Sequence, residues 1–563
     1  MQKPARKQGR NATLTATPLL TRGLLHLLAM FCFSSAFGQT PTPTPEPTPN
    51  QPTFTTPLKP MPDPSRVGVN TAEPLSLSLT DAIDMALKNS NDIDVSRNDA
   101  QISDFNLKAA KGIYDPFFNS QTFYESRTTP TASTIGGAVN GSVTQRQFFN
   151  DIGLSGFTPR FGGSYDVIFN QARTVTTNRN ATLNPQFPTN LIATYTQPLW
   201  RGLRIDANRR NIMIAGKNIE ISESQLRLKA IDSISSVEQA YWDLVFALRN
   251  LQVQNDTLTH AREQLESNKR LVDKGVLAPI EIVAAEAQIA TFEQLIFAAQ
   301  ESVTRNENIL KTLLLPDRSA AEWSRPITPV TSTNPQIPRI GLEVATAEAM
   351  KNRPEIAQLE TQSDINKIDQ RFYKDQTKPQ IDLVGSYTAA GLAGTPNPLS
   401  SGAANVPPNL VGGYGSSLGN LAALDYPTYR VGVQIGLPLR NRTAKANFGR
   451  SLVEGDRIAN NRAQTEQIVE AEVRNALQAL RSSESRLASA TASRIAAEEL
   501  LASEQRQFRA GTTTFYLVRQ RTTDLAIARS LEFRTQSDLN KAVSEFQRAI
   551  GATLTVNNVS VSK

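Results

Sequence analysis

Stretches of helical spacing and stretches of strict alternation follow one another twice along this chain of 563 residues. Segments in which apolar and polar residues alternate come between a first helix and a very long second helix in each set. The strands are predicted within 117–199 in the first set, and at 380–387 and 429–437 in the second. The helices are predicted over 81–113, 204–274 and 279–315, and again over 344–374, 444–510 and 514–550.

Two copies of one unit explain this order. Residues 82–116 align without a gap with 345–379 at an offset of 263, whereas 270–275 align with 506–511 at an offset of 236. The first copy therefore holds 27 more residues, mostly in its strand region. We expect two structural repeats in one chain. Their bounds are 75–315 for the first repeat, 316–341 for the segment between them, 342–552 for the second repeat and 553–563 for the tail.

The surplus of the first copy predicts an additional hairpin, Ile152–Phe157 with Gly163–Phe169, which we expect on the extracellular side. Residues 390–425 are rich in Gly, Asn, Pro and Ser and predict a long exposed loop. The outer strands are about long enough to cross a bilayer. Four strands from one chain cannot close a barrel, and lipid does not tolerate an open sheet edge. The strands therefore form either a soluble sheet or a barrel shared between copies, and three copies would give twelve strands.

The two longest helices favour the shared barrel. Each would reach roughly 100 Å if continuous, at about 1.5 Å per residue, which a compact domain does not need. A heptad seam runs through both, from Val237 to Leu265 and from Val473 to Leu501. Coiled helical hairpins fit this pattern best. Some seam positions are polar, and they either set the register of a bundle or face a water-filled lumen.

Residues 1–38 have the pattern of an export signal, with basic residues, the apolar run Leu24–Phe33 and a small-residue cleavage site. Cys32 is the only cysteine, so its removal would exclude disulfides and thiolate metal sites. No later stretch reaches about 18 consecutive apolar residues, so no helical membrane span is expected. Residues 39–74 are expected to be a periplasmic tether, because ten prolines lie within 40–64.

Composition argues against enzymes and nucleic-acid binders. Removing the export signal leaves 54 basic and 52 acidic residues, mixed in sign along the helices rather than gathered on one face. The only histidines are His26 and His260, which excludes histidine-based triads and argues against zinc. No phosphate-binding glycine loop is present in the sequence. We expect no catalysis, no metal, no cofactor and no nucleic-acid partner.

The twofold repeat, the motif Gln239–Val245 and the two glycine-containing segments 270–283 and 506–518 resemble the outer membrane efflux family, the TolC-like exit ducts of tripartite pumps and type I secretion systems. The resemblance covers 75–552. It implies an α+β membrane protein: a homotrimer with a twelve-strand barrel in the outer membrane and a long periplasmic α-helical tunnel. It also implies a passive duct whose periplasmic tip opens on docking to an adaptor protein and an inner-membrane transporter.

The resemblance also assigns roles at the two tips. The residues implied to meet the adaptor are Lys274, Gly275, Val276, Ala510, Gly511 and Thr512. Those implied to surround the tunnel aperture are Glu281, Phe508, Thr513, Leu517 and Gln520. Several of the latter depart from the family pattern, since Leu517 and Gln520 stand where aspartates are usual and Phe508 where a tyrosine is usual. We therefore expect a closed state held more by apolar contacts than by charged links, and weakened cation selectivity.

Two other protein classes share part of the pattern. A periplasmic adaptor also has a coiled hairpin, but it should have one hairpin flanked by small β domains. A structural coiled-coil protein would not need strands of membrane length. The transported substrate cannot be inferred from a passive duct.

Overall fold

The computed structural model describes residues 66–70, 73–132, 134–138 and 140–561. The expected export signal and most of the expected tether lie outside the described residues. Residues 66–70 do not behave as a free tether. The Arg66 guanidinium lies 2.5 Å from a carboxylate oxygen of Glu307, and the Asn70 amide donates to the Ser324 carbonyl at 2.7 Å. Residues 66–70, at the end of the expected tether, therefore have polar partners on the first repeat and on the segment that follows it.

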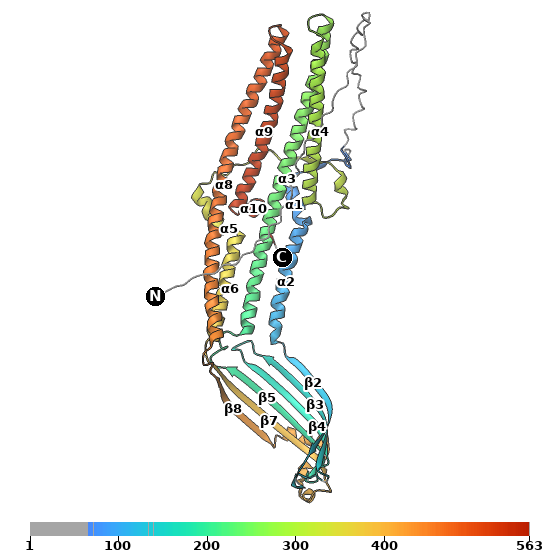
Figure 1. Ribbon diagram of the computed structural model, residues 1–563, viewed down its shortest axis with the longest axis vertical. Coiled ribbons are helices and arrows are strands. Elements are labelled where there is room, and N and C mark those ends of the chain that lie inside the picture. Colours follow the sequence, from blue (N-terminus) through green and yellow to red (C-terminus); the bar gives the residue numbers. More distant parts are fainter. Residues whose placement is uncertain (1–65, 71–72, 133, 139, 562–563) are drawn as a thin grey trace, which may run out of the picture. The chain divides into compact units, whose positions relative to one another are not determined.

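Each repeat contributes one long helical hairpin (Figure 1). The first pairs α3 (Ala207–Asp273) with α4 (Ile280–Leu314), and the second pairs α8 (Arg442–Arg509) with α9 (Phe515–Ala549). Both hairpins turn at the same end of the helical part, and the sheet lies at its other end. α4 is apolar enough to cross a membrane by length and composition alone, with a mean hydropathy of 1.3 over 18 residues. It packs along α3, through contacts such as that of Phe292 with Leu258.

The first helix of each repeat is shorter than the sequence predicts, because both are broken. The helix expected over 81–113 divides into α1 (Leu79–Asn89) and α2 (Asn91–Lys111). Ser90 separates them: its amide caps the end of α1 on the Ala86 carbonyl, and its hydroxyl accepts from the Ile93 amide at the start of α2. In the second repeat, α5 (Leu342–Asn352) gives way to α6 (Pro354–Gln376), since proline favours a first helical position.

Apolar cores lie at the middle of the long helices. In the first repeat, Tyr241 and Leu244 of α3 are fully buried with Ile83 and Leu310, beside a parallel pair of short strands, β1 (Leu75–Leu77) and β6 (Ile327–Pro329). The Tyr241 hydroxyl donates to the Leu77 carbonyl at 3.0 Å and accepts from the Thr331 amide at 3.2 Å. These contacts fasten the start of the described chain to the long helix.

The second repeat has an equivalent core, in which Val473 of α8 packs with Ala349 and Phe546. The repeats are joined at this level, since the Ser537 hydroxyl of α9 donates to the Trp242 carbonyl of α3 at 2.7 Å. Nearby, the carboxyl of Glu238 is 3% exposed and hydrogen-bonded to Asn557 and Ser544. Burial raises its pKa, and the two hydrogen bonds oppose that rise. We call this level, with both cores, the helical belt.

The strands of both repeats form one antiparallel sheet in the order β2-β3-β4-β5-β7-β8. The predicted fold class is confirmed, but the sheet has six strands rather than about four. The additional hairpin lies inside the sheet, hydrogen-bonded on both sides, and not beyond it. Its alternation is broken by polar residues, which hid its length in the sequence. The strands are β2 (Phe117–Pro130), β3 (Ser142–Phe157), β4 (Ser164–Thr176), β5 (Leu183–Pro198), β7 (Gln380–Pro396) and β8 (Pro427–Gly436).

The expected loop over 390–425 is partly ordered structure. β7 continues to Pro396, and a helix, α7 (Tyr414–Ala423), packs against β7 and β5. Gly391 permits the close approach, because a Cβ there would lie 2.3 Å from the Ser417 carbonyl oxygen. The Thr189 and Ser417 hydroxyls are 2.9 Å apart across the same contact. Glycine and serine predict a loop in the sequence, but here Gly391 and Ser417 allow a helix to lie close to a strand.

Candidate functional site at the hairpin tips

The first hairpin turns at Gly275, whose φ of +70° is a left-handed conformation that residues with a side chain rarely adopt. The Gly275 amide donates to the Val272 carbonyl at 2.8 Å, and the Val276 amide donates to Leu271 at 2.9 Å. This pair of bonds is the Schellman arrangement that ends many helices. No atom lies within 4 Å of where a Gly275 Cβ would be, so its backbone conformation, and not crowding, calls for glycine.

The second hairpin repeats the same turn at Gly511, with a φ of +73°. The Gly511 amide donates to the Phe508 carbonyl and the Thr512 amide to the Gln507 carbonyl, both at 3.0 Å. The space around a Gly511 Cβ is also empty. The sequence repeat therefore extends to the hydrogen bonds of the turn.

A groove of about 850 Å³ separates the two hairpins near their tips. The first hairpin lines it with apolar, polar and charged side chains, among them Leu271, Gln264 and Glu263. From the second hairpin, Phe508 and Phe515 form one wall, with ring centroids 6.1 Å apart. Val518, which is buried, continues that wall. The groove therefore has an apolar wall near the tips and polar side chains farther from them.

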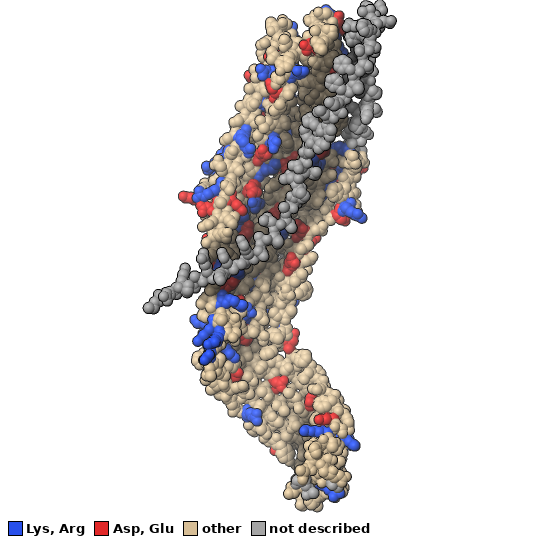
Figure 2. All heavy atoms as spheres, in the orientation of Figure 1, with Lys and Arg blue, Asp and Glu red and all other residues tan. Residues whose placement is uncertain are grey.

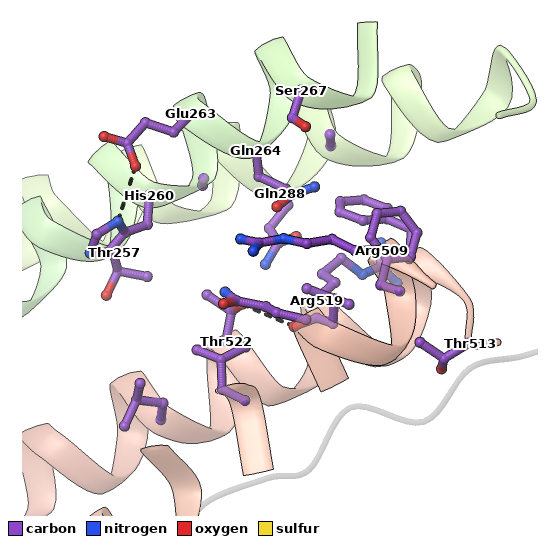
Figure 3. Close-up of a pocket in the computed structure, with 18 of the residues that line it drawn as sticks. Thr257, His260, Glu263, Gln264, Ser267, Gln288, Arg509, Thr513, Arg519 and Thr522 are labelled. Carbon is purple, nitrogen blue, oxygen red and sulfur yellow. Dashed lines mark hydrogen bonds and ion pairs between the residues drawn. The ribbon is translucent and has the colours of Figure 1, made fainter. Parts of the chain in front are cut away.

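Two arginines extend into this groove from the second hairpin (Figure 3). Arg519 lies over the ring of Tyr516 at 5.2 Å, and Arg509 lies on the last turn of α8. Within the described residues neither guanidinium has a carboxylate within ion-pair distance. Deeper in the groove, Arg529 is paired with Glu498 at 2.9 Å. The groove near the tips therefore holds two arginine side chains without a carboxylate partner, while Glu263 of the first hairpin lies 3.2 Å from His260.

The structure brings only part of the predicted aperture set to the groove. Phe508 and Thr513 line it, and the Thr513 hydroxyl donates to the Glu504 carboxylate. Glu281 lies in the first turn of α4, Leu517 is 38% exposed, and Gln520 donates to Asp524 at 3.0 Å; none of these three lines the groove. Among the predicted docking residues, Val276 and Gly511 line the groove. The remaining four, Lys274, Gly275, Ala510 and Thr512, lie exposed at the two turns.

Sequence reasoning missed the position of Arg509. Nothing in its spacing from Gly511 indicates that the side chain faces the other hairpin, because this depends on how two helices pack. Arg519 and Arg521 both follow the second turn in sequence, but Arg521 is paired with Asp524 at 3.2 Å. Of these two, Arg519 is the one whose charge stays available in the groove.

Comparison with known proteins gives one match in sequence and many in structure. Residues 156–314 match the family model of the outer membrane efflux protein. The matched region runs from the end of β3 to the end of α4 and so includes the first hairpin and its tip. The predicted resemblance to the efflux protein family is confirmed.

The fold is shared with solved outer-membrane channels. The outer-membrane channel OprN aligns over 86% of this chain and 94% of its own, with a TM-score of 0.59 and 16% identity. The outer membrane channel CmeC of Campylobacter jejuni aligns over 84% and 86%, with a TM-score of 0.59 and 15% identity. The open state of the MtrE outer membrane channel of Neisseria gonorrhoeae aligns over 84% of this chain and 89% of its own, with a TM-score of 0.55 and 16% identity. No curated protein matches the sequence.

Proposed function

We propose that this chain is the outer-membrane exit duct of an efflux or secretion system, a passive homotrimeric channel-tunnel in the outer membrane and the periplasm. The observation that carries the proposal is the union, in one chain, of a sheet with strands of membrane length and two long hairpins with matching glycine turns. The efflux-family match and the channel folds of OprN, CmeC and MtrE support it.

Exposed apolar side chains support assembly of several copies. Leu295, Phe297 and Ile309 of α4 are 36–49% exposed, as are Ile495 and Leu531 of the second hairpin at 45% and 47%. Exposed large apolar side chains are typical of surfaces that contact another protein. In a ring of hairpins such side chains would contact the next copy.

The tips are the proposed contact with an adaptor protein and an inner-membrane transporter, and the groove is the proposed gate. The apolar wall of Phe508 and Phe515 supports closure by apolar contacts. The free charges of Arg509 and Arg519 support weakened cation selectivity, since fixed charge in a narrow passage repels ions of its own sign.

The function is tested by fractionation and by growth. An outer-membrane duct should appear in the outer membrane fraction as trimers that need detergent for extraction. Its deletion should make cells more sensitive to at least one drug, dye or metal, or should reduce the secretion of a protein. An adaptor would fractionate with the inner membrane or the periplasm. Recovery as a soluble periplasmic protein would contradict the duct.

The gate is tested by single-channel recording in planar bilayers. The double variant Arg509→Gln/Arg519→Gln should shift selectivity toward cations. Arg506→Gln is the matched control, because Arg506 is exposed near the same turn and does not line the groove. Strong cation selectivity in the unaltered trimer would contradict the proposed gate and leave the duct itself untouched.

A further inference from the structure

Near its helical end, the six-stranded sheet has one apolar face and one polar face. Register places one row of paired residues across all six strands on the first face: Phe118, Leu154, Val167, Ala193, Tyr387 and Tyr429. Every member of this row is apolar or aromatic. Charged side chains are sparse over the sheet and frequent over the helices in the view of Figure 2.

The neighbouring row points to the opposite face, since successive side chains alternate along a strand. It contains Phe117, Ser155, Asp166, Thr194, Ser386 and Arg430. Five of these six are polar or charged. The apolar exceptions on this face include Phe123 and Phe149, whose rings contact each other at 4.8 Å between centroids. A sheet with one apolar and one aqueous face matches the wall of a water-filled membrane barrel.

Near the helical end of the sheet, the additional hairpin of β3 and β4 shares this two-faced pattern. Leu154 and Val167 lie in the apolar row, and Ser155 and Asp166 lie in the polar row. β2 is paired with β3 over its whole length, so the hairpin separates β2 from β5. At about 4.8 Å per strand, β2 and β5 are three spacings, or about 14 Å, apart. The hairpin is therefore part of the wall and not an extracellular appendage.

The wall has two open edges within the described residues. β2 and β8 are exposed along their whole lengths, and neither has a second neighbour in the sheet. β8 has ten residues, which span about 24 Å of bilayer at the usual tilt. Unpaired backbone groups at that depth are not tolerated in lipid, so another strand must cover each edge.

A second copy of this chain supplies that strand with the correct direction. β2 begins at the helical end of the sheet with Phe117, and β8 ends there with Gly436. Placed side by side, β8 of one copy and β2 of the next run antiparallel, like every other pair in the sheet. The edges are thus compatible with a closed ring of identical sheets.

We propose that three copies close as a barrel of eighteen strands, six from each chain, widened by the β3–β4 hairpin beyond the twelve strands that four per chain would give. This rests on the proposed trimeric duct and goes beyond it. Barrel diameter grows roughly in proportion to strand number, so the lumen would be about half as wide again. A wider exit suits bulkier cargo than a twelve-strand barrel of equal tilt would pass.

Disulfide trapping in the full chain tests the closure, in a Cys32→Ser background that removes the only native cysteine. Phe118→Cys combined in turn with Val431→Cys, Val433→Cys or Ile435→Cys should give disulfide-linked trimers for at least one pair. Phe117→Cys with the same partners is the matched control, because Phe117 points to the other face. Phe118→Cys with Leu154→Cys should form a disulfide within one chain, since these residues are directly paired.

The competing arrangement expels the hairpin and pairs β2 with β5. In that case Phe118→Cys with Ala193→Cys would cross-link, although in the six-stranded sheet about 14 Å separates these strands and a disulfide needs Cα atoms within about 7 Å. That result, or electron microscopy of the purified trimer showing a barrel of twelve-strand width, would overturn the proposal and leave the duct intact. Absence of outer-membrane trimers would overturn both.

Discussion

Replacing either tip glycine by alanine should loosen its turn by a calculable amount. Gly275 and Gly511 have φ values of +70° and +73°, and no atom lies within 4 Å of an added Cβ. The cost is therefore conformational alone, about 1–2 kcal/mol for an L residue in the left-handed region. That free energy corresponds to a 5- to 30-fold larger equilibrium constant for opening the turn.

Hydrogen exchange followed by mass spectrometry measures this constant in the assembled protein. The amides at positions 511 and 512 close the second turn, and in Gly511→Ala they should exchange about 5- to 30-fold faster than in the unaltered chain. The exchange rate in Gly511→Asn should lie between those of the unaltered chain and Gly511→Ala, because asparagine tolerates the left-handed region better than alanine. Gly449→Ala is the matched control: Gly449 lies within α8 with open space around it, so alanine there should stabilise the helix and leave tip exchange unchanged.

Unchanged exchange in Gly511→Ala would refute the claim that backbone conformation calls for glycine at the tip. An effect of equal size in Gly449→Ala would refute the claim that the effect is local. A loss of adaptor binding in Gly511→Ala without faster exchange would instead favour an absent side chain as the reason for glycine.

Three further predictions concern the helical belt and can be read from heat unfolding in detergent, followed by circular dichroism. Glu238→Gln should raise stability at neutral pH and flatten the pH dependence of stability. Burial raises the pKa of the Glu238 carboxyl, so its contribution to the free energy of unfolding is fully present below the pKa of the unfolded state. That contribution is lost as pH rises through the pKa of the folded state. A pH profile identical to that of the unaltered chain would contradict this. Tyr241→Phe should cost about 1–3 kcal/mol, because the Thr331 amide and the Leu77 carbonyl lose a partner in a buried site; a change within error would show that other groups replace the hydroxyl. Glu307→Ala should cost about 3–5 kcal/mol by leaving the buried Lys311 ammonium, 2.7 Å from Glu307, without that partner, and adding Lys311→Met should recover part of the loss. Additive losses in the double variant would count against the buried pair.

The long hairpins and their tips could be predicted because the sequence states them twice. Gly275 and Gly511 end helices in both copies, and a glycine at such a place has one common structural meaning. The breaks at Ser90 and Pro354 were harder, since helical spacing continues across both and the break depends on which residue caps which helix.

The sheet was only partly predictable. β7 and β8 alternate cleanly, whereas β3 and β4 mix apolar and polar residues on both faces, so only their apolar ends were recognised. The Gly and Ser residues of α7 predict a loop because they are also turn formers, and only contact with β7 distinguishes the two roles. The direction of Arg509 depends on packing between hairpins that are more than 200 residues apart in sequence.

The position of the helical belt has a mechanical consequence. Tyr241 lies at the centre of α3, 32 residues from its end at Asp273, so about 48 Å of helix extends from the belt to the tip. Buried residues of α3 are most frequent around the belt and become fewer toward the tip. The belt can therefore act as a pivot about which each hairpin tilts. A tilt of about 5° there would displace a tip by about 4 Å, the scale of a side chain. Small rearrangements at the pivot, around Tyr241 and Glu238, would therefore suffice to move the walls of the groove between the tips.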